Sequence, residues 1–140
     1  MMVDVYAPYG RFRQKAEAAD LWIAGGVGVT PFIAWLQAGP ADRLQQVTLI
    51  YLHTPGRELP ATVDLNALAA ERGVNLVDIS GGPESPAFRA CFATIVRARG
   101  AVAVRIAFCG PDALLHKVHA LMEAHGVPFA HLRNELFEFR

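Results

Sequence analysis

The stretch DLWIAGGVGVTPFIAWLQA, residues 20–38, decides the fold of this chain. Its apolar run at 20–24 stops at glycines, which is typical of a short strand buried on both faces of a sheet. Residues 30–38 then place apolar side chains at helical spacing. Pro31 suits the first helical turn, because its missing N–H would be unpaired there anyway. A buried strand that enters a helix through a glycine turn predicts one unit of an α/β fold.

Short apolar runs and amphipathic stretches alternate along the rest of the chain. Strands are predicted at 46–52, 74–79 and 102–108, helices at 64–72, 87–97 and 112–125, and short terminal strands or extended segments at 127–132 and 135–139. This alternation predicts an α/β fold, a doubly wound five-stranded parallel sheet with helices on both faces. Ligands of such sheets bind at the carboxyl ends of the strands. The glycine turn at 25–31 and the segment 109–111, Cys-Gly-Pro, are therefore the two candidate site segments.

The composition narrows the class of protein and of partner. Thirteen Lys and Arg residues balance thirteen Asp and Glu residues, so no basic surplus points to nucleic acid or to an anionic membrane. Cys91 and Cys109 form no CxxC pair, which argues against a disulfide scaffold or a zinc site and favours a reducing cytosol. His116 and His119 are spaced to share a ligand on one helix, but no acid or cysteine obviously completes the set, so no metal site is expected.

The glycine turn has the composition of a phosphate cradle. Its glycines let the backbone approach a phosphate closely, and the helix start adds free N–H donors and the positive end of the helix dipole. Thr30 can cap that helix or bond a phosphate oxygen. The turn departs from the fingerprint Gly-x-Gly-x-x-Gly, because Pro31 replaces the third glycine and residues 52–54, Leu-His-Thr, hold no ribose-binding acid. These departures exclude a standard NAD-dehydrogenase site, and the glycines alone leave a ligand-free turn equally open.

Four segments, in the expected order, resemble the ferredoxin–NADP reductase superfamily. Residues 21–32 resemble its pyrophosphate-binding segment, and residues 108–112, Phe-Cys-Gly-Pro-Asp, resemble its Cys-Gly-Pro segment at the nicotinamide. Residues 135–140 resemble the C-terminus of the ferric-reductase-like branch, which includes relatives of NADPH oxidases. Residues 7–12 resemble the segment that closes the flavin domain of these enzymes. The resemblance covers nearly the whole chain and implies a ferredoxin-reductase-like nucleotide-binding fold.

The resemblance also implies how the chain is divided. The flavin-binding signature of the family, Arg-x-Tyr-Ser/Thr, occurs nowhere in the sequence. Residues 1–18 are therefore expected to be the tail of a preceding flavin-binding domain with its linker, or an added edge strand. Residues 19–140 are expected to be the NAD(P)-binding domain. A truncated chain, a split gene and a partner-dependent subunit would all leave FAD to a missing domain or a partner.

The implied activity is hydride transfer from NAD(P)H to FAD, followed by electron transfer to haem, iron–sulfur or ferric iron. The implied partners are a flavin-binding domain and a haem membrane domain or an iron–sulfur protein. The expected location is the cytoplasm, or the cytoplasmic face of a membrane as part of a larger protein. The alternative from a different class is a non-catalytic nucleotide-binding or regulatory module of the same fold.

Residue roles follow by position in the two motifs. The resemblance assigns the dinucleotide phosphates to Gly25, Gly26, Gly28, Thr30 and Pro31. Thr30 has the alternative of being a helix cap alone, although both roles can hold together.

The nicotinamide end is assigned to Cys109, Gly110 and Pro111. A thiol there is small and polarizable, so it can touch the ring without trapping charge. The alternative for Cys109 is a small buried hydrophobe at a strand end. Glu135 and Phe137 are expected near the flavin and nicotinamide rings, with an inward-facing edge strand as the alternative for Phe137.

The choice of nucleotide depends on the region after the second strand, where the family often places an arginine that meets the adenosine ribose or its 2′-phosphate. Here His53, Thr54 and Arg57 occupy that region. An arginine clamps a phosphate better than a neutral histidine does. Arg57 and the lack of a ribose-binding acid favour NADPH over NADH, and a solvated loop arginine is the alternative for Arg57.

Overall fold

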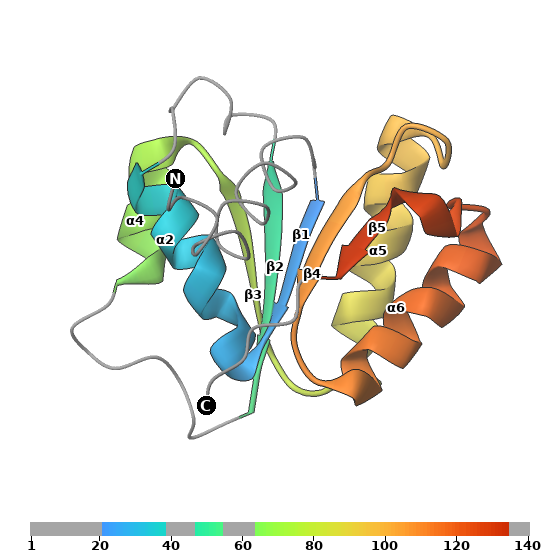
Figure 1. The fold of residues 1–140 in the computed structure, drawn as a ribbon, viewed down its shortest axis with the longest axis horizontal. Helices are drawn as coiled ribbons and strands as arrows, with labels where there is room; N and C mark the ends of the chain where they lie inside the picture. The colour runs from blue at the N-terminus through green and yellow to red at the C-terminus, as the bar shows by residue number, and fades with distance from the viewer. Residues whose placement is uncertain (1–20, 39–46, 55–63, 135–140) are drawn as a thin grey trace, which may run out of the picture.

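A computed structural model describes residues 21–38, 47–54 and 64–134 of the 140-residue chain. The strands are β1 (Leu21–Gly25), β2 (Thr48–His53), β3 (Asn75–Ser80), β4 (Ile106–Cys109) and β5 (Leu132–Asn134). The helices are α2 (Thr30–Ala38), α4 (Leu65–Arg72), α5 (Pro86–Arg99) and α6 (Asp112–His125), with short 3₁₀ turns η2 (Gly26–Val29) and η3 (Phe129–His131). All the strand pairs are parallel, so the predicted five-stranded α/β fold is confirmed (Figure 1).

The order of the strands creates one special position at the carboxyl edge of the sheet. That order is β3-β2-β1-β4-β5. The chain therefore moves outward from β1 to β2 and β3, and α5 then carries it back to β4 on the other side of β1. Doubly wound sheets bind ligands at such a switch point, because the connections after the two neighbouring strands leave in opposite directions. Here the switch point lies between β1 and β4.

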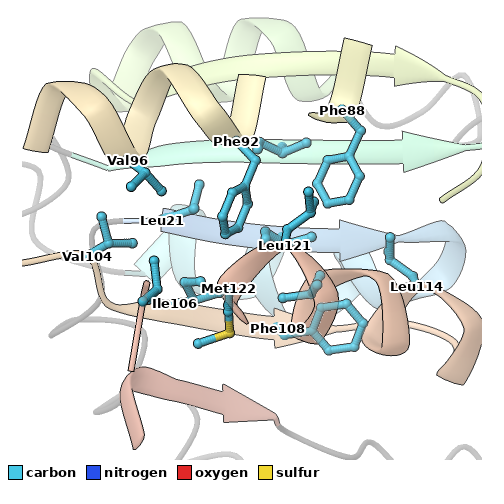
Figure 2. Packing of buried hydrophobic residues seen from close by; sticks show 14 of the residues in the cluster. Leu21, Phe88, Phe92, Val96, Val104, Ile106, Phe108, Leu114, Leu121 and Met122 are labelled. Carbon is cyan, nitrogen blue, oxygen red and sulfur yellow. The ribbon is translucent and has the colours of Figure 1, made fainter. Parts of the chain in front are cut away.

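Helices cover both faces of the sheet (Figure 1). On one face α2 and α4 pack over a cluster that includes Trp22, Phe32 and Tyr51. On the other face α5 and α6 pack over a second cluster, which Figure 2 shows with Phe88 and Phe92 of α5 above Phe108 of β4. Every residue of β1, β2 and β4 is buried. This burial explains why the sequence of these strands is mostly apolar rather than alternating, with Thr48 and His53 at the two ends of β2 as the polar exceptions.

Two predicted strands differ from those in the structure. The strand predicted at 102–108 begins only at Ile106, because Ala103 N–H bonds Gly100 O at 3.0 Å in a turn that leaves Val102 75% exposed. Of the segment predicted at 127–132, only Leu132 is in a strand. Val127 is buried in the core before Phe129–His131 forms a 3₁₀ turn. The boundaries of the other elements within the described residues differ by two positions at most.

Within the described ranges, no helix combines the length and the hydropathy that crossing a membrane requires. Each helix instead packs its apolar side on the sheet. Both ends of α4 show the local signals that start and stop a helix. At its start, Asp64 accepts a hydrogen bond from Ala67 N at 3.0 Å, and Gly73 ends the helix at a φ of 78°.

Phe32 should be central to the stability of the unit formed by β1 and α2. Its ring stacks on Trp22 of β1 at a centroid distance of 5.2 Å and is fully buried. Phe32→Ala should lower the free energy of unfolding by about 4 kcal/mol, because it removes a buried ring and leaves a cavity. Exposed Val102→Ala is the control and should change it by less than about 0.5 kcal/mol in the same urea titration. A loss below about 1 kcal/mol for Phe32→Ala would contradict this packing.

Candidate nucleotide site at the switch point

The two candidate segments are in direct backbone contact. Ala24 and Cys109 are register partners on neighbouring β1 and β4, so the residues that follow them leave the sheet side by side. A Cβ atom placed on Gly28 would lie 2.2 Å from the carbonyl oxygen of Cys109, and one placed on Gly110 would lie 3.1 Å from the nitrogen of Gly25. At Gly28 only glycine leaves room for so close an approach, and at Gly110 a side chain would be tightly placed. Segments far apart in the chain therefore form one structural unit at the switch point.

The start of α6 completes this unit. A Cβ atom on Gly25 would lie 2.7 Å from Leu114 Cδ2 and 2.9 Å from Pro111 Cδ. Leu114 is buried in the second core cluster. The end of β1 is thus held between the segment that leaves β4 and the first turn of the helix that follows it.

Gly26 differs from the other glycines of the turn. It has a φ of +57°, it is exposed, and a Cβ atom placed on it would meet nothing within 4 Å. Its backbone conformation requires glycine, while the space above it is open. Thr30, the first residue of α2, is also exposed, whereas Pro31 is buried. The predicted phosphate contacts thus divide into a surface pair, Gly26 and Thr30, and the buried residues Gly25, Gly28 and Pro31.

The surface pair lies where an anion would be stabilised. The first N–H groups of an α-helix have no partner within the helix, and the helix dipole is positive at that end. Helix α2 begins at Thr30, directly after the turn that contains Gly26. An anionic group above Gly26 would therefore meet backbone N–H groups without having to displace a side chain.

Cys109 is the last residue of β4 and is 4% exposed, in the core cluster that also holds Ala24 and Tyr51. This burial fits the alternative considered for it, a small apolar residue at a strand end. In the same segment Gly110 is half-buried and Pro111 is exposed, so these two are the more accessible members. Cys91 of α5 is half-buried, and burial raises the pKa of its thiol, so it stays protonated at neutral pH.

His53 ends β2 and is 7% exposed. Its Nε2 donates a hydrogen bond to the Asp78 carboxylate of the neighbouring strand β3, and the Tyr51 ring lies 4.9 Å from the His53 ring between centroids. Asp78 was missed from the sequence because the acid was sought after the second strand. Residues 52–54 hold no acid, but the pairing of Tyr51 with Asp78 in the sheet brings a carboxylate of β3 within hydrogen-bond reach of His53.

The other predicted site residues, Arg57, Glu135 and Phe137, lie outside the described residues, as does the segment 1–18. Their assigned roles therefore stay predictions. The structure brings together the glycine turn and the Cys-Gly-Pro segment, and it places His53 at the neighbouring end of β2, which contacts the η2 turn.

Comparisons with known proteins agree with this arrangement, although no family model matches the chain. A search of curated proteins finds 31% identity over 119 residues to the probable dihydroorotate dehydrogenase B (NAD(+)) electron transfer subunit of Pyrococcus abyssi, covering 84% of this chain and 44% of that protein. Ferredoxin-NADP+ reductase from Plasmodium falciparum superimposes with a TM-score of 0.66 at 14% identity, over 87% of this chain and 53% of that one. The chain has the nucleotide-binding fold of the ferredoxin–NADP+ reductase superfamily.

A third similar protein is the flavohem-like FAD/NAD binding domain of nitric oxide dioxygenase from Vibrio cholerae. It has a TM-score of 0.56 at 20% identity, over 84% of this chain and 50% of that one. The chain spans about half the length, or less, of each of these proteins. The resemblance inferred from the four sequence segments is confirmed, and the closer link to the ferric-reductase branch stays a prediction.

The two kinds of glycine should respond differently to the same substitution. Gly28→Ala should lower the free energy of unfolding by about 3 kcal/mol or more, because the new Cβ collides with backbone that cannot rotate away. Gly26→Ala should cost about 1 kcal/mol, since it adds only the strain of a left-handed backbone conformation. Thermal and urea denaturation of the two variants measure the difference. Equal losses would contradict the backbone contact with Cys109.

Proposed function

We propose that this chain is the NAD(P)H-binding domain of a flavin-dependent oxidoreductase. It would present NAD(P)H for hydride transfer to FAD, with onward electron transfer to haem, iron–sulfur or ferric iron. The observation that carries the proposal is the backbone contact between the glycine turn and the Cys-Gly-Pro segment at the switch point of the sheet. A ligand-free strand-to-helix turn would need no such contact with a second motif.

Each half of the site would hold a different part of the nucleotide. The pyrophosphate would lie above Gly26 and Thr30, where the start of α2 offers N–H donors and the open space above Gly26 admits an anion. The nicotinamide would lie beside Gly110 and Pro111, beyond the end of β4. The remaining adenosine half would extend over the ends of β2 and β3, because β2 adjoins β1 on the side away from β4.

The bound groups would supply the redox chemistry, and the chain would supply binding and orientation. Hydride transfer requires the reacting carbon to be held at a fixed position, and small misplacements are costly in rate. A turn fixed by glycine packing on β4 suits that task. Cys109, at the end of β4 behind Gly110, would set the floor on which the nicotinamide rests.

The similar proteins support this division of roles, within what their names state. One is an electron transfer subunit, one a ferredoxin-NADP+ reductase and one an FAD/NAD binding domain. For this chain we propose that residues 1–18 are the tail of a flavin-binding domain and residues 19–140 the NAD(P)-binding domain. FAD would be held by that further domain or by a partner chain. We also propose a cytoplasmic location, or one at the cytoplasmic face of a membrane.

Nucleotide binding is the first test. In heteronuclear NMR titrations, NADH or NADPH should shift the amide signals of Gly26 and Thr30 together with those of Cys109 and Gly110. Gly26→Ala should weaken binding about tenfold, because a Cβ atom would occupy the space above the turn and strain the backbone that donates there.

Gly126→Ala is the matched control for that variant. Gly126 also has a positive φ, 75°, and open space around its missing Cβ, but it caps the far end of α6. It should lose similar stability and keep its nucleotide affinity. Binding that shifts neither segment, or an equal loss of affinity in both variants, would reject the proposed site.

Cys109 should affect the reaction more than the binding. In a preparation that contains the flavin-binding domain, Cys109→Ala should slow reduction of the flavin by NAD(P)H about tenfold or more, because the nicotinamide would lose its fixed support. Nucleotide affinity should change by less than about twofold. Stopped-flow absorbance of the flavin measures the rate, and Cys91→Ala on the opposite face of the sheet is the control. An unchanged rate would leave Cys109 as a buried residue of the strand end alone.

A further inference from the structure

The pair formed by His53 and Asp78 has no part in the proposed reaction and lies at the edge where the adenosine half would extend. His53 is the last residue of β2, Asp78 lies in the middle of β3, and the His53 Nε2 donates to the Asp78 carboxylate. The side chain of His53 is 7% exposed and that of Asp78 is 45% exposed. A ligand that reaches this pair therefore meets the carboxylate before it meets the imidazole.

The His53–Asp78 pair lies on the face of the sheet that is covered by α2, the helix that follows the glycine turn. Tyr51 pairs with Ala24 on one side and with Asp78 on the other. Side chains of residues in register on neighbouring strands point to the same face. Ala24 and Tyr51 belong to the cluster under α2 and α4, so Asp78 and His53 project toward that side. The glycine turn follows β1. Strand β2, which carries His53, lies one strand spacing from β1, and β3, which carries Asp78, lies two spacings away, with about 4.8 Å per spacing.

We infer that Asp78 reads the adenosine ribose and makes this site selective for NADH over NADPH. The inference rests on the proposed function. In nucleotide-binding sheets, a carboxylate at this edge accepts hydrogen bonds from the ribose 2′-hydroxyl, and it disfavours a 2′-phosphate by charge repulsion. That carboxylate ordinarily follows the second strand, whereas here it comes from the third, two residues before that strand ends, and it is hydrogen-bonded by His53, the last residue of the second.

His53 holds the carboxylate in place and does not serve as a phosphate-binding cation. Its Nε2 is already used by Asp78, and the ring is packed against Tyr51. If the imidazole is neutral, the pair carries one negative charge; if it is protonated, the pair carries none. In neither state does it offer a net positive charge to a 2′-phosphate. The sequence-based preference for NADPH depended on Arg57 and on a missing acid, and the second of these two supports is lost.

The selectivity can be measured on the chain itself by calorimetric titration with NADH and with NADPH at one ionic strength. Unaltered protein should bind NADH at least about tenfold more tightly than NADPH, because hydrogen bonds to a charged group are worth that much in affinity. Asp78→Asn should bring the two dissociation constants to within about threefold, by weakening NADH and strengthening NADPH. An asparagine amide can still bond the ribose, so Asp78→Ser is a second variant, and it should also bring the two dissociation constants to within about threefold. Thermal melting will verify that both variants are folded.

Glu123→Gln is the matched control, since it removes one negative charge from an exposed position in the last turns of α6. It should leave the ratio of the two dissociation constants unchanged. A preference for NADPH in unaltered protein, or a ratio that Asp78→Asn and Asp78→Ser leave unchanged, overturns the inference while the proposed function stands. If neither nucleotide binds or shifts the Gly26 and Thr30 amide signals, the proposed function and this inference both fail.

Discussion

The contact of the η2 turn with the end of β4 fixes the geometry on which the rest of this edge depends. With no side chain on Gly28 or Gly110, the backbone after β1 rests directly on the backbone after β4. Strand pairing between β1 and β4 aligns the two ends, and Leu114 of α6 closes the unit from below. Because the contact is between main chains, it leaves little freedom to slide or tilt. The start of α2 and the positive-φ residue Gly26 are consequently held at one position above the edge.

A glycine-rich turn is commonly interpreted as a set of equivalent phosphate contacts, and this turn separates those roles. Gly25 and Gly28 are needed where the chain packs inward, while Gly26 is needed for its backbone conformation and faces outward. A substitution at an inward position destabilises the fold at this edge, so its direct effect on ligand binding cannot be measured separately. The outward position is the one at which binding and stability can be separated experimentally. Loss of binding after mutation of an arbitrary glycine in such a turn is therefore weak evidence for phosphate contact.

The His53–Asp78 pair illustrates how a parallel sheet supplies a chemical group from an unexpected strand. Fingerprints for nucleotide sites follow the chain, so they look for an acid after the second strand. A ligand contacts whichever side chains lie near the edge of the sheet, whatever their order along the chain. Strands β2 and β3 present their residues side by side, and Asp78, in register with Tyr51, lies close enough for its carboxylate to bond His53 at the end of β2. The orientation of the Asp78 carboxylate then depends on its hydrogen bond with a largely buried imidazole.

The sequence by itself determined the α/β class, the five-stranded parallel sheet, the helix bounds 30–38 and 112–125, and both segments of the candidate site. These features are encoded locally, because apolar periodicity, glycine and proline act through neighbouring residues. The start of β4 was placed too early, since Val102 is apolar but lies in an exposed turn. Only the tertiary structure decided which glycines face inward and which acid accompanies His53. Both depend on strand order and register, which long crossovers through α4 and α5 set and which no local pattern records.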